Sequence, residues 1–225
     1  MGVTPKELAE LYPCLYHMAE VDSWESIAKH GLLSTSALLD LFEINAETRQ
    51  NIESRRRERS YEIKHAVLGR AIVRDQKPII ESKLQACLRD CTLEEWYKLL
   101  NGRVFFWLIK ERLNTLLSAR EYREKPHLVL TLDTRTLAED YIGSITLSPM
   151  NTGNTLPFAH PRSKATFSRM QDYPYQERLK RGPYYTVVEL AVEGGVYDIA
   201  CYTICVDLMM SKGGQVVTLQ RIFTR

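Results

Sequence analysis

Leu15-Tyr16-His17-Met18 and Gly31-Leu32-Leu33-Ser34 are two mostly apolar segments, separated by a short stretch that holds Trp24 and Ile27. The first segment is typical of a buried strand and carries a histidine near its end. Trp24 and Ile27 are three residues apart, so they share one face of a helix. Glycine often follows the last turn of a helix. The stretch therefore predicts a strand, a short helix packed against it and a turn, with His17 fixed by that packing.

The ends of this first helix carry their own signals. Asp22 can cap the helix, and Glu25, three residues later, can complete a capping box. Ser34, Thr35 and Ser36 follow the turn. Hydroxyl side chains in this place either cap the next helix or contact a ligand, and the sequence leaves both roles open.

The composition is that of an ordinary folded protein. The 225 residues are 44% hydrophobic and 26% charged, and 30 basic residues nearly balance 28 acidic ones. A chain of this length can bury a large core, and we expect a single domain over residues 1–225. No apolar run approaches the roughly 20 residues that span a bilayer, so we expect no membrane partner and a cytoplasmic location. The sequence does not indicate an oligomeric state.

The five cysteines include two pairs with a four-residue step, Cys87 with Cys91 and Cys201 with Cys205. Structural zinc sites usually place their ligands on tight turns, whereas these pairs fall in a helical and a strand-like pattern. We therefore expect reduced thiols and no metal.

Residues 36–100 are expected to form a helical insertion. Residues 36–66 have a charged helical pattern, residues 67–78 indicate a short strand or hairpin with a polar loop, and residues 81–100 indicate a second helix, restarted by Thr92. A basic run within the insertion consists of Arg55, Arg56, Arg57 and Arg59. This run predicts either a solvated helix face or a contact with nucleic-acid phosphates, because affinity for the phosphate backbone depends on local cationic density.

Strands dominate the second half of the chain. The expected strands are residues 102–108, 128–133, 185–192, 196–208 and 215–223, with helices at 111–122 and from Thr134 to Tyr141. Residues 149–183 are rich in proline and polar residues and are expected to form a long irregular loop, which is usually functional in a compact domain. Early helices followed by late strands predict a mixed α+β fold.

Several common catalytic motifs are absent from the sequence. There is no GxGxxG after a strand, no P-loop, no HExxH and no GxSxG. Their absence argues against a Rossmann dehydrogenase, a P-loop NTPase, a zincin and an ordinary α/β-hydrolase.

Three elements occur in a fixed order instead: Tyr16-His17 in the first segment, the aromatic run Gly102–Leu108, and the apolar run Val187–Val192 around Glu189. In this order they resemble the ADP-ribosyltransferase superfamily. The segment Glu189–Ala200 is particularly similar to the end of the DNA-modifying toxin branch of that superfamily. One departure is Met18-Ala19, because family members often carry Thr or Gly-Thr after the histidine.

The resemblance implies two small antiparallel sheets around an NAD cleft, with a helical insertion. It implies transfer of ADP-ribose from NAD to an acceptor, such as a DNA or RNA base, with release of nicotinamide. The catalytic residues would be Glu189, His17 and Arg103. The residues expected to contact NAD, some from the matched motifs and Arg74 from a polar loop, are Tyr16, His17, Met18, Ser34, Thr35, Arg74, Phe105, Phe106 and Trp107.

The chemistry accounts for these residue types. Breaking the bond between nicotinamide and ribose leaves positive charge on the ribose, as in glycoside hydrolysis, and a buried carboxylate such as Glu189 can stabilise it. A glutamate in an apolar strand is either buried for function or exposed on an edge strand. Arg103 either binds a phosphate of NAD or pairs with a neighbouring carboxylate. Alternation along the strand places Phe106 on one face and Phe105 and Trp107 on the other.

Two other functions stay open at this level. RNA 2′-phosphotransferases share the fold and a similar histidine at the start, but they normally need further basic and histidine residues early in the chain, which are absent here. The second is a catalytically inactive domain of the same fold that binds a nucleotide or a partner. Nicotinamide release separates this second possibility from an active ADP-ribosyltransferase.

Overall fold

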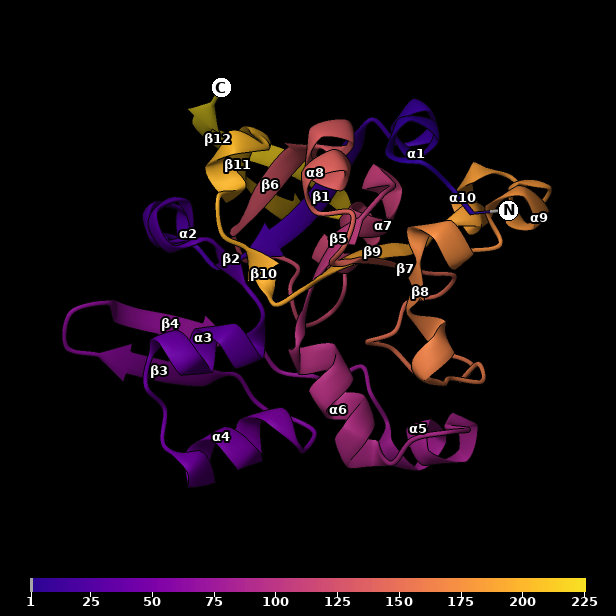
Figure 1. Ribbon diagram of the computed structural model, residues 1–225. Helices are drawn as coiled ribbons and strands as arrows, with labels where there is room; N and C mark the ends of the chain where they lie inside the picture. The colour runs from indigo at the N-terminus through magenta and orange to yellow at the C-terminus, as the bar shows by residue number, and fades with distance from the viewer. Residues whose placement is uncertain (1) are drawn as a thin grey trace.

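The computed structural model describes residues 2–225, and its centre is an antiparallel sheet of eight strands. The strands lie in the order β12-β11-β6-β1-β5-β9-β7-β8. Their bounds are β1 (Cys14–Ala19), β5 (Arg103–Trp107), β6 (His127–Asp133), β7 (Ile145–Ser148), β8 (Ser168–Arg169), β9 (Glu189–Glu193), β11 (Thr203–Lys212) and β12 (Gln215–Thr224). Helices pack around this sheet (Figure 1), so the fold is mixed α+β, as the sequence predicts.

The sheet consists of two four-stranded halves that meet at one residue pair. β1 pairs with β6 at six positions and β5 pairs with β9 at five, whereas β1 and β5 are in register only at Tyr16 and Trp107. Beyond this pair the ladder between β1 and β5 stops. The prediction of two small sheets is therefore wrong in connectivity, because the Tyr16–Trp107 pair joins the halves into one sheet.

Apolar side chains cover both faces of the sheet because successive residues of a strand point to opposite sides. On β6, Leu130 belongs to the larger core, to which α1 (Pro5–Leu11) and α8 (Thr134–Asp140) contribute Leu8 and Leu137. The neighbouring Val129 belongs to a second cluster under α7 (Lys110–Leu117). The two layers hold the half-sheets in place and so fix the region where β1 and β5 separate.

The helix predicted after His17, α2 (Trp24–His30), differs from its prediction at one end. Its N-cap is Ser23, without a side-chain cap, and Asp22 adopts a left-handed backbone with φ of 64°. The expected capping box is therefore wrong. At the other end Gly31 has φ of 92° and its N–H donates to Ile27, as predicted for the residue that ends the helix. A Cβ at Gly31 would lie 2.6 Å from the Cα of Tyr197, so this position also requires glycine for space.

Residues 36–100 contain helices and a hairpin, as predicted, but the hairpin begins earlier than expected, at Tyr61. The elements of this region are α3 (Thr35–Leu41), α4 (Ala46–Glu53), β3 (Tyr61–His65), β4 (Gly69–Val73), α5 (Glu81–Cys87) and α6 (Leu93–Asn101). The helical prediction for residues 36–66 fails after Glu53, because the alternating burial of β3 places Ile63 inside and its neighbours outside. The restart at Thr92 is confirmed, since Thr92 and Glu95 form a capping box. These elements form the lower part of the molecule in Figure 1.

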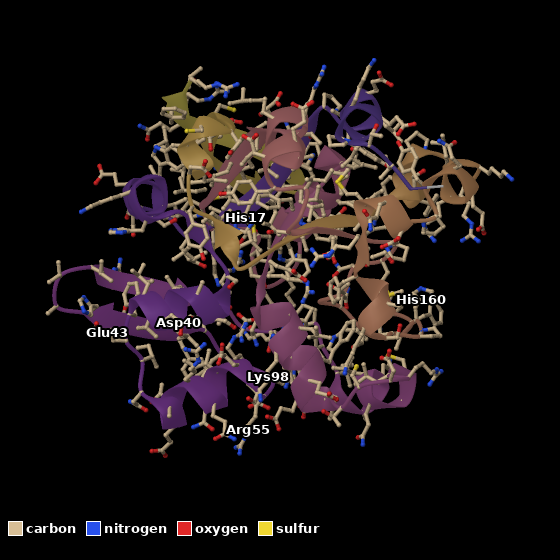
Figure 2. The ribbon with its side chains drawn as sticks, viewed as in Figure 1. His17, Asp40, Glu43, Arg55, Lys98 and His160 are labelled. Atoms are coloured by element: carbon tan, nitrogen blue, oxygen red, sulfur yellow. The ribbon has the colours of Figure 1, made fainter. Side chains whose placement is uncertain are left out.

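The basic run is not a helix face. It begins after the end of α4, and Arg57 is buried with 6% of its surface exposed. Its guanidinium donates to the carbonyl oxygens of Ile52 and Arg74 and to Oδ1 of Asn101 at 2.7–2.8 Å. Arg57 therefore ties α4, the hairpin and α6 together. Arg55 lies at the outer margin of the lower part, far from His17 (Figure 2).

Residues 149–183 are mostly irregular, as predicted. They hold only the short elements η1 (Lys164–Thr166), β8, η2 (Met170–Asp172) and α9 (Tyr175–Leu179). Tyr173 and Tyr175 are buried and fasten the segment to the core. The strand expected at 185–192 begins later, at Glu189, because α10 (Pro183–Thr186) precedes it.

The strand expected at 196–208 is divided into β10 (Gly195–Val196) and β11, and α1 and β7 have no counterpart among the predicted elements. β10 pairs with β2 (Leu32–Leu33), and η3 (Ile199–Cys201) leads into β11. α7 ends at Leu117, earlier than expected, and Asp133 rather than Thr134 caps α8. Within residues 2–225, no helix has the length and apolar character that a bilayer crossing requires.

Candidate active site

A cavity of about 570 Å³ opens where β1 and β5 separate. Both half-sheets, the insertion and the loop after β7 contribute to its walls. The predicted site residues that line it are His17, Met18, Thr35, Arg74, Arg103, Phe105, Phe106, Trp107 and Glu189. Its volume is within the roughly 300–1,000 Å³ that is usual for small-molecule sites.

Tyr16 and Ser34 are the two predicted residues that do not line this cavity. Tyr16 packs into the cluster under α7. Ser34 is buried, and its hydroxyl accepts a hydrogen bond from the backbone N–H of Ala37 at 3.2 Å. Of the two roles left open for the Ser34 hydroxyl, the structure therefore shows the helix cap, whereas the next residue, Thr35, lines the cavity.

His17 bridges the gap between the half-sheets. Its Nδ1 lies 2.8 Å from the backbone oxygen of Phe105. A carbonyl oxygen only accepts, so Nδ1 carries the proton and Nε2 is left as an acceptor. Burial, together with the charge of Arg74, lowers the pKa of His17 to about 4, although the bond to Phe105 acts in the opposite direction. The imidazole is therefore neutral at pH 7, with its tautomer fixed by the backbone.

Glu189 is the buried carboxyl group of the cavity, with 4% of its surface exposed. It is the first residue of β9, where it faces Trp107 on β5 and Ser148 on β7. This central place excludes the edge-strand explanation. Burial raises the pKa of Glu189 to about 7, while hydrogen bonds from Thr152 oppose that rise. Glu189 is thus close to half ionised at neutral pH.

One oxygen of Glu189 is held by the irregular segment that follows β7. The backbone N–H of Thr152 donates to Oε2 at 3.0 Å, and the Thr152 hydroxyl donates to the same oxygen at 2.7 Å. Among residues 2–225, none donates a hydrogen bond to the other oxygen, Oε1. Glu189 therefore has one oxygen fixed by the protein and one available to a ligand.

Arg103 is committed to contacts within the protein. Its Nη2 donates to Glu193 at 2.6 Å and its Nη1 donates to the carbonyl of Leu99 at 2.8 Å. The guanidinium also lies 4.6 Å from the ring centre of Phe167. Of its two predicted roles, the structure shows the pairing with a neighbouring carboxylate.

Two other arginines border the cavity. Arg74 lies 4.5 Å from the ring centre of Tyr122 and 3.5 Å from a carboxylate oxygen of Glu20, and its Nη1 donates to the carbonyl oxygen of Met18 at 3.4 Å. Arg112, on α7, lies 4.0 Å from the ring centre of Tyr184 and donates to its carbonyl oxygen. Both arginines supply positive charge to a cavity that would accept an anionic ligand.

The aromatic strand β5 alternates as predicted. Phe106 is buried, and its ring lies 5.7 Å from that of His17. Phe105 and Trp107 are partly exposed, and Phe105 packs near Phe167. Phe106 therefore packs against the ring of His17, and all three aromatic side chains form part of the cavity wall.

Sequence patterns missed Thr152, Arg112, Asn101 and Tyr184, all of which line the cavity. Thr152 lies in a stretch without periodicity, so nothing local indicates its contact with a residue 37 positions away. Arg112 is the only one with a usable signal, because it lies in the first turn of the helix that follows the aromatic strand. Among the described residues, no group of His, Cys, Asp and Glu side chains could hold a metal ion, and all five cysteines are unpaired.

A second hollow of about 680 Å³ lies beside the N-terminal segment, near Gly2, Glu7 and Arg169. None of the predicted site residues lines it. Its carboxylate, Glu7, is bound to Thr4 in the capping box of α1. This hollow therefore lacks the buried acid that distinguishes the cavity at the sheet junction.

The chain belongs to a recognised family, described as a family of unknown function (DUF7002), whose match covers residues 13–203. The matched range contains His17, the aromatic strand and Glu189. No curated protein and no solved structure matches the chain.

Proposed function

We propose that this protein is an NAD-dependent ADP-ribosyltransferase with the fold of that superfamily. The observation that carries the proposal is that neutral His17 and buried Glu189, from the two halves of the sheet, line one cavity where the halves separate. The same residues carry the resemblance in the sequence. In this proposal the cavity binds NAD, nicotinamide leaves, and ADP-ribose passes to an acceptor.

His17 and Glu189 supply complementary functions for this reaction. Nε2 of His17 is an acceptor at a fixed place and can orient a ribose hydroxyl. The ionised form of Glu189 can accept a ribose hydroxyl through Oε1 and stabilise positive charge on the ribose as the bond to nicotinamide breaks. The bond electrons leave with nicotinamide, the acceptor atom bonds to the ribose carbon, and the acceptor proton is released.

The cavity has a volume usual for small-molecule sites, and the chemistry of its walls suits NAD. Aromatic side chains of β5 suit a flat pyridinium ring, and the guanidinium groups of Arg74 and Arg112 suit a pyrophosphate. Nε of Arg112 is buried without a partner among residues 2–225, so it is a donor that a ligand can satisfy. Arg103 also has a buried Nε without a partner among these residues, but its Nη atoms already donate to Glu193 and Leu99, so it is less suited to this role.

We propose a DNA or RNA base as the acceptor. Support comes from Tyr184 and Tyr185, which are 40% and 56% exposed beside Arg112. Exposed aromatic rings next to a guanidinium are a surface on which unpaired bases stack. The arginine run at 55–59 gives no such support, since Arg57 is buried in contacts within the protein and Arg55 does not line the cavity.

The test is nicotinamide release from NAD by the purified protein, alone and with single-stranded DNA, duplex DNA or RNA. We expect release to rise with pH through about 7, as Glu189 ionises. Glu189→Gln should lower kcat by about a hundredfold or more, because a general base or charge-stabilising carboxylate contributes about that much. Binding of NAD should change little, since glutamine keeps the shape and the contact with Thr152.

Glu177→Gln is the matched control, because Glu177 is exposed on α9 and outside the cavity. It should release nicotinamide at the rate of the unmodified protein. Tight NAD binding without release would favour an inactive nucleotide-binding domain. Neither binding nor release by the folded protein would refute the proposal.

A further inference from the structure

Thr152 makes the only direct polar contacts that the described protein residues offer to the carboxyl group of Glu189. Both its backbone N–H and its hydroxyl donate to Oε2, so the carboxylate cannot rotate without losing two hydrogen bonds. Thr152 is itself 1% exposed, which shields these bonds from water. The bound oxygen is fixed, and Oε1 is left toward the cavity.

The segment that carries Thr152 is anchored by a buried arginine. Arg162 donates through Nη2 to the carbonyl oxygens of Asn151 and Asn154, which flank Thr152. Its Nη1 donates to the carbonyl of His160 and to Sγ of Cys87 at the end of α5. Arg162 is 2% exposed and forms no ion pair in residues 2–225. Its guanidinium therefore holds this loop to the insertion.

We infer that Thr152 is a positioning residue for Glu189: by holding one carboxylate oxygen it aims the other into the cavity. This inference rests on the proposed transfer reaction. Thr152 has no assigned contact with substrate and works only through Glu189. The anchoring by Arg162 explains how an irregular segment can hold a carboxylate in one orientation.

The groups around Glu189 differ in their effect on its pKa. Arg162 in the loop and Arg112 on α7 both lower its pKa, and the two bonds from Thr152 lower it more. His17 on β1 is neutral at pH 7, and Arg103 on β5 is paired with Glu193. Ser148, which faces Glu189 from β7, carries no charge. Removing the Thr152 hydroxyl therefore removes one of the hydrogen bonds that oppose the effect of burial, and the pKa of Glu189 rises further.

The first test measures the ionisation of Glu189 without any activity. Glu189 has an ordinary pKa of 4.5 when exposed and about 7 in the folded protein, so it destabilises the fold increasingly as pH rises between these values. The melting temperature is measured from pH 5 to 9 for the unmodified protein and for each threonine variant described below. Each is compared with the same protein carrying Glu189→Gln. The difference should stop growing near pH 7 in the unmodified protein.

In Thr152→Val this plateau should move to higher pH by about one pH unit, because one of the two opposing hydrogen bonds is lost. Thr152→Ser keeps a hydroxyl and should leave the plateau near pH 7. Thr155→Val is the matched control, since Thr155 is equally buried in the same loop but bonds to Ile80 and Pro78. Equal plateaus in Thr152→Val and Thr155→Val would overturn the inference, and Thr152→Ala replaces valine if that variant does not fold.

The second test uses nicotinamide release. Thr152→Val should lower kcat about fivefold at pH 7 and about twofold or less at pH 9, where Glu189 ionises without help. KM for NAD should change little, and Thr152→Ser should restore the rate. An equal loss at both pH values would indicate a purely structural role and contradict the inference. If the unmodified protein releases no nicotinamide, the proposed function fails, while the melting-temperature test still decides the role of Thr152.

Discussion

Burial moves the pKa values of the two central residues in opposite directions, that of His17 to about 4 and that of Glu189 to about 7. Each shift disfavours the charged form, as expected for groups taken out of water. The histidine therefore stays neutral above about pH 5, and only Glu189 changes charge near pH 7. A site of this kind responds to pH through its acid alone.

The shift of His17 predicts a specific acid sensitivity of the fold. The unfolded chain takes up a proton near pH 6.5 but the folded protein only near 4, so stability is lost as pH falls between these values. His17→Gln keeps a donor for Phe105 and does not titrate. Between pH 7 and pH 4.5 the unmodified protein should lose about 2 kcal/mol relative to this variant. Urea denaturation at both pH values measures this difference.

His160→Gln provides the comparison for this experiment, because His160 is exposed on the irregular segment 149–183, away from His17 (Figure 2). Its stability should follow that of the unmodified protein at both pH values. If His17→Gln and His160→Gln show the same pH dependence, His17 does not have the low pKa that its burial implies.

At the scale of elements, the insertion depends on a buried arginine rather than on helix propensity. Arg57→Met would leave the carbonyl oxygens of Ile52 and Arg74 and the Oδ1 of Asn101 without this donor. Unsatisfied buried groups are costly, so we expect a loss of about 3 kcal/mol in the free energy of unfolding. Denaturant titration measures it.

Arg59→Met is the control for this prediction, because Arg59 belongs to the same basic run but is exposed. Its stability should lie within about 0.5 kcal/mol of the unmodified protein. A similar small change in Arg57→Met would mean that the buried network around Asn101 contributes little to stability.

The elements also show what the sequence could and could not predict. The capping box at Thr92 was predictable because both partners lie within one helical turn. The same logic failed at Asp22, whose left-handed backbone removes it from the cap position. The arginine run misled because four arginines within five positions suggest a solvated surface, whereas one of them, Arg57, is buried. Tertiary packing, which sequence periodicity does not contain, decides such cases.

The candidate site likewise has residues that the sequence could predict and residues that it could not. His17, Glu189 and the aromatic strand were predictable because each lies in an apolar run that indicates a strand. That they line one cavity follows from the order of the strands in the sheet, which local patterns do not determine. Thr152 was not predictable, since its partner is far away in the chain and its own segment has no repeating pattern.

At the scale of the whole molecule, β11 is as important as any strand inside the family match. That match ends at residue 203, where β11 begins. β11 pairs with β6 at six positions and contributes Val206 and Met209 to the two core clusters. A chain cut after residue 203 should therefore aggregate, as light scattering and size-exclusion chromatography would show, because β6 would have an open apolar edge.

A chain cut after Lys212 tests the same point more gently. It lacks β12, whose residues are mostly exposed, but it keeps the strand that covers β6. This shorter protein should remain folded and elute as a defined species. If both truncated chains behave alike, β11 is not what protects the edge of β6.

The mismatch between the family match and the sheet has a practical consequence for laboratory and evolutionary comparison. The residues that match the family end at 203, whereas the sheet continues through β11 and β12. Genes trimmed to the recognisable part would yield inclusion bodies and be scored as inactive, whatever the chemistry of the cavity. Expression boundaries are therefore better taken from the last strand that pairs with β6 than from the end of sequence similarity.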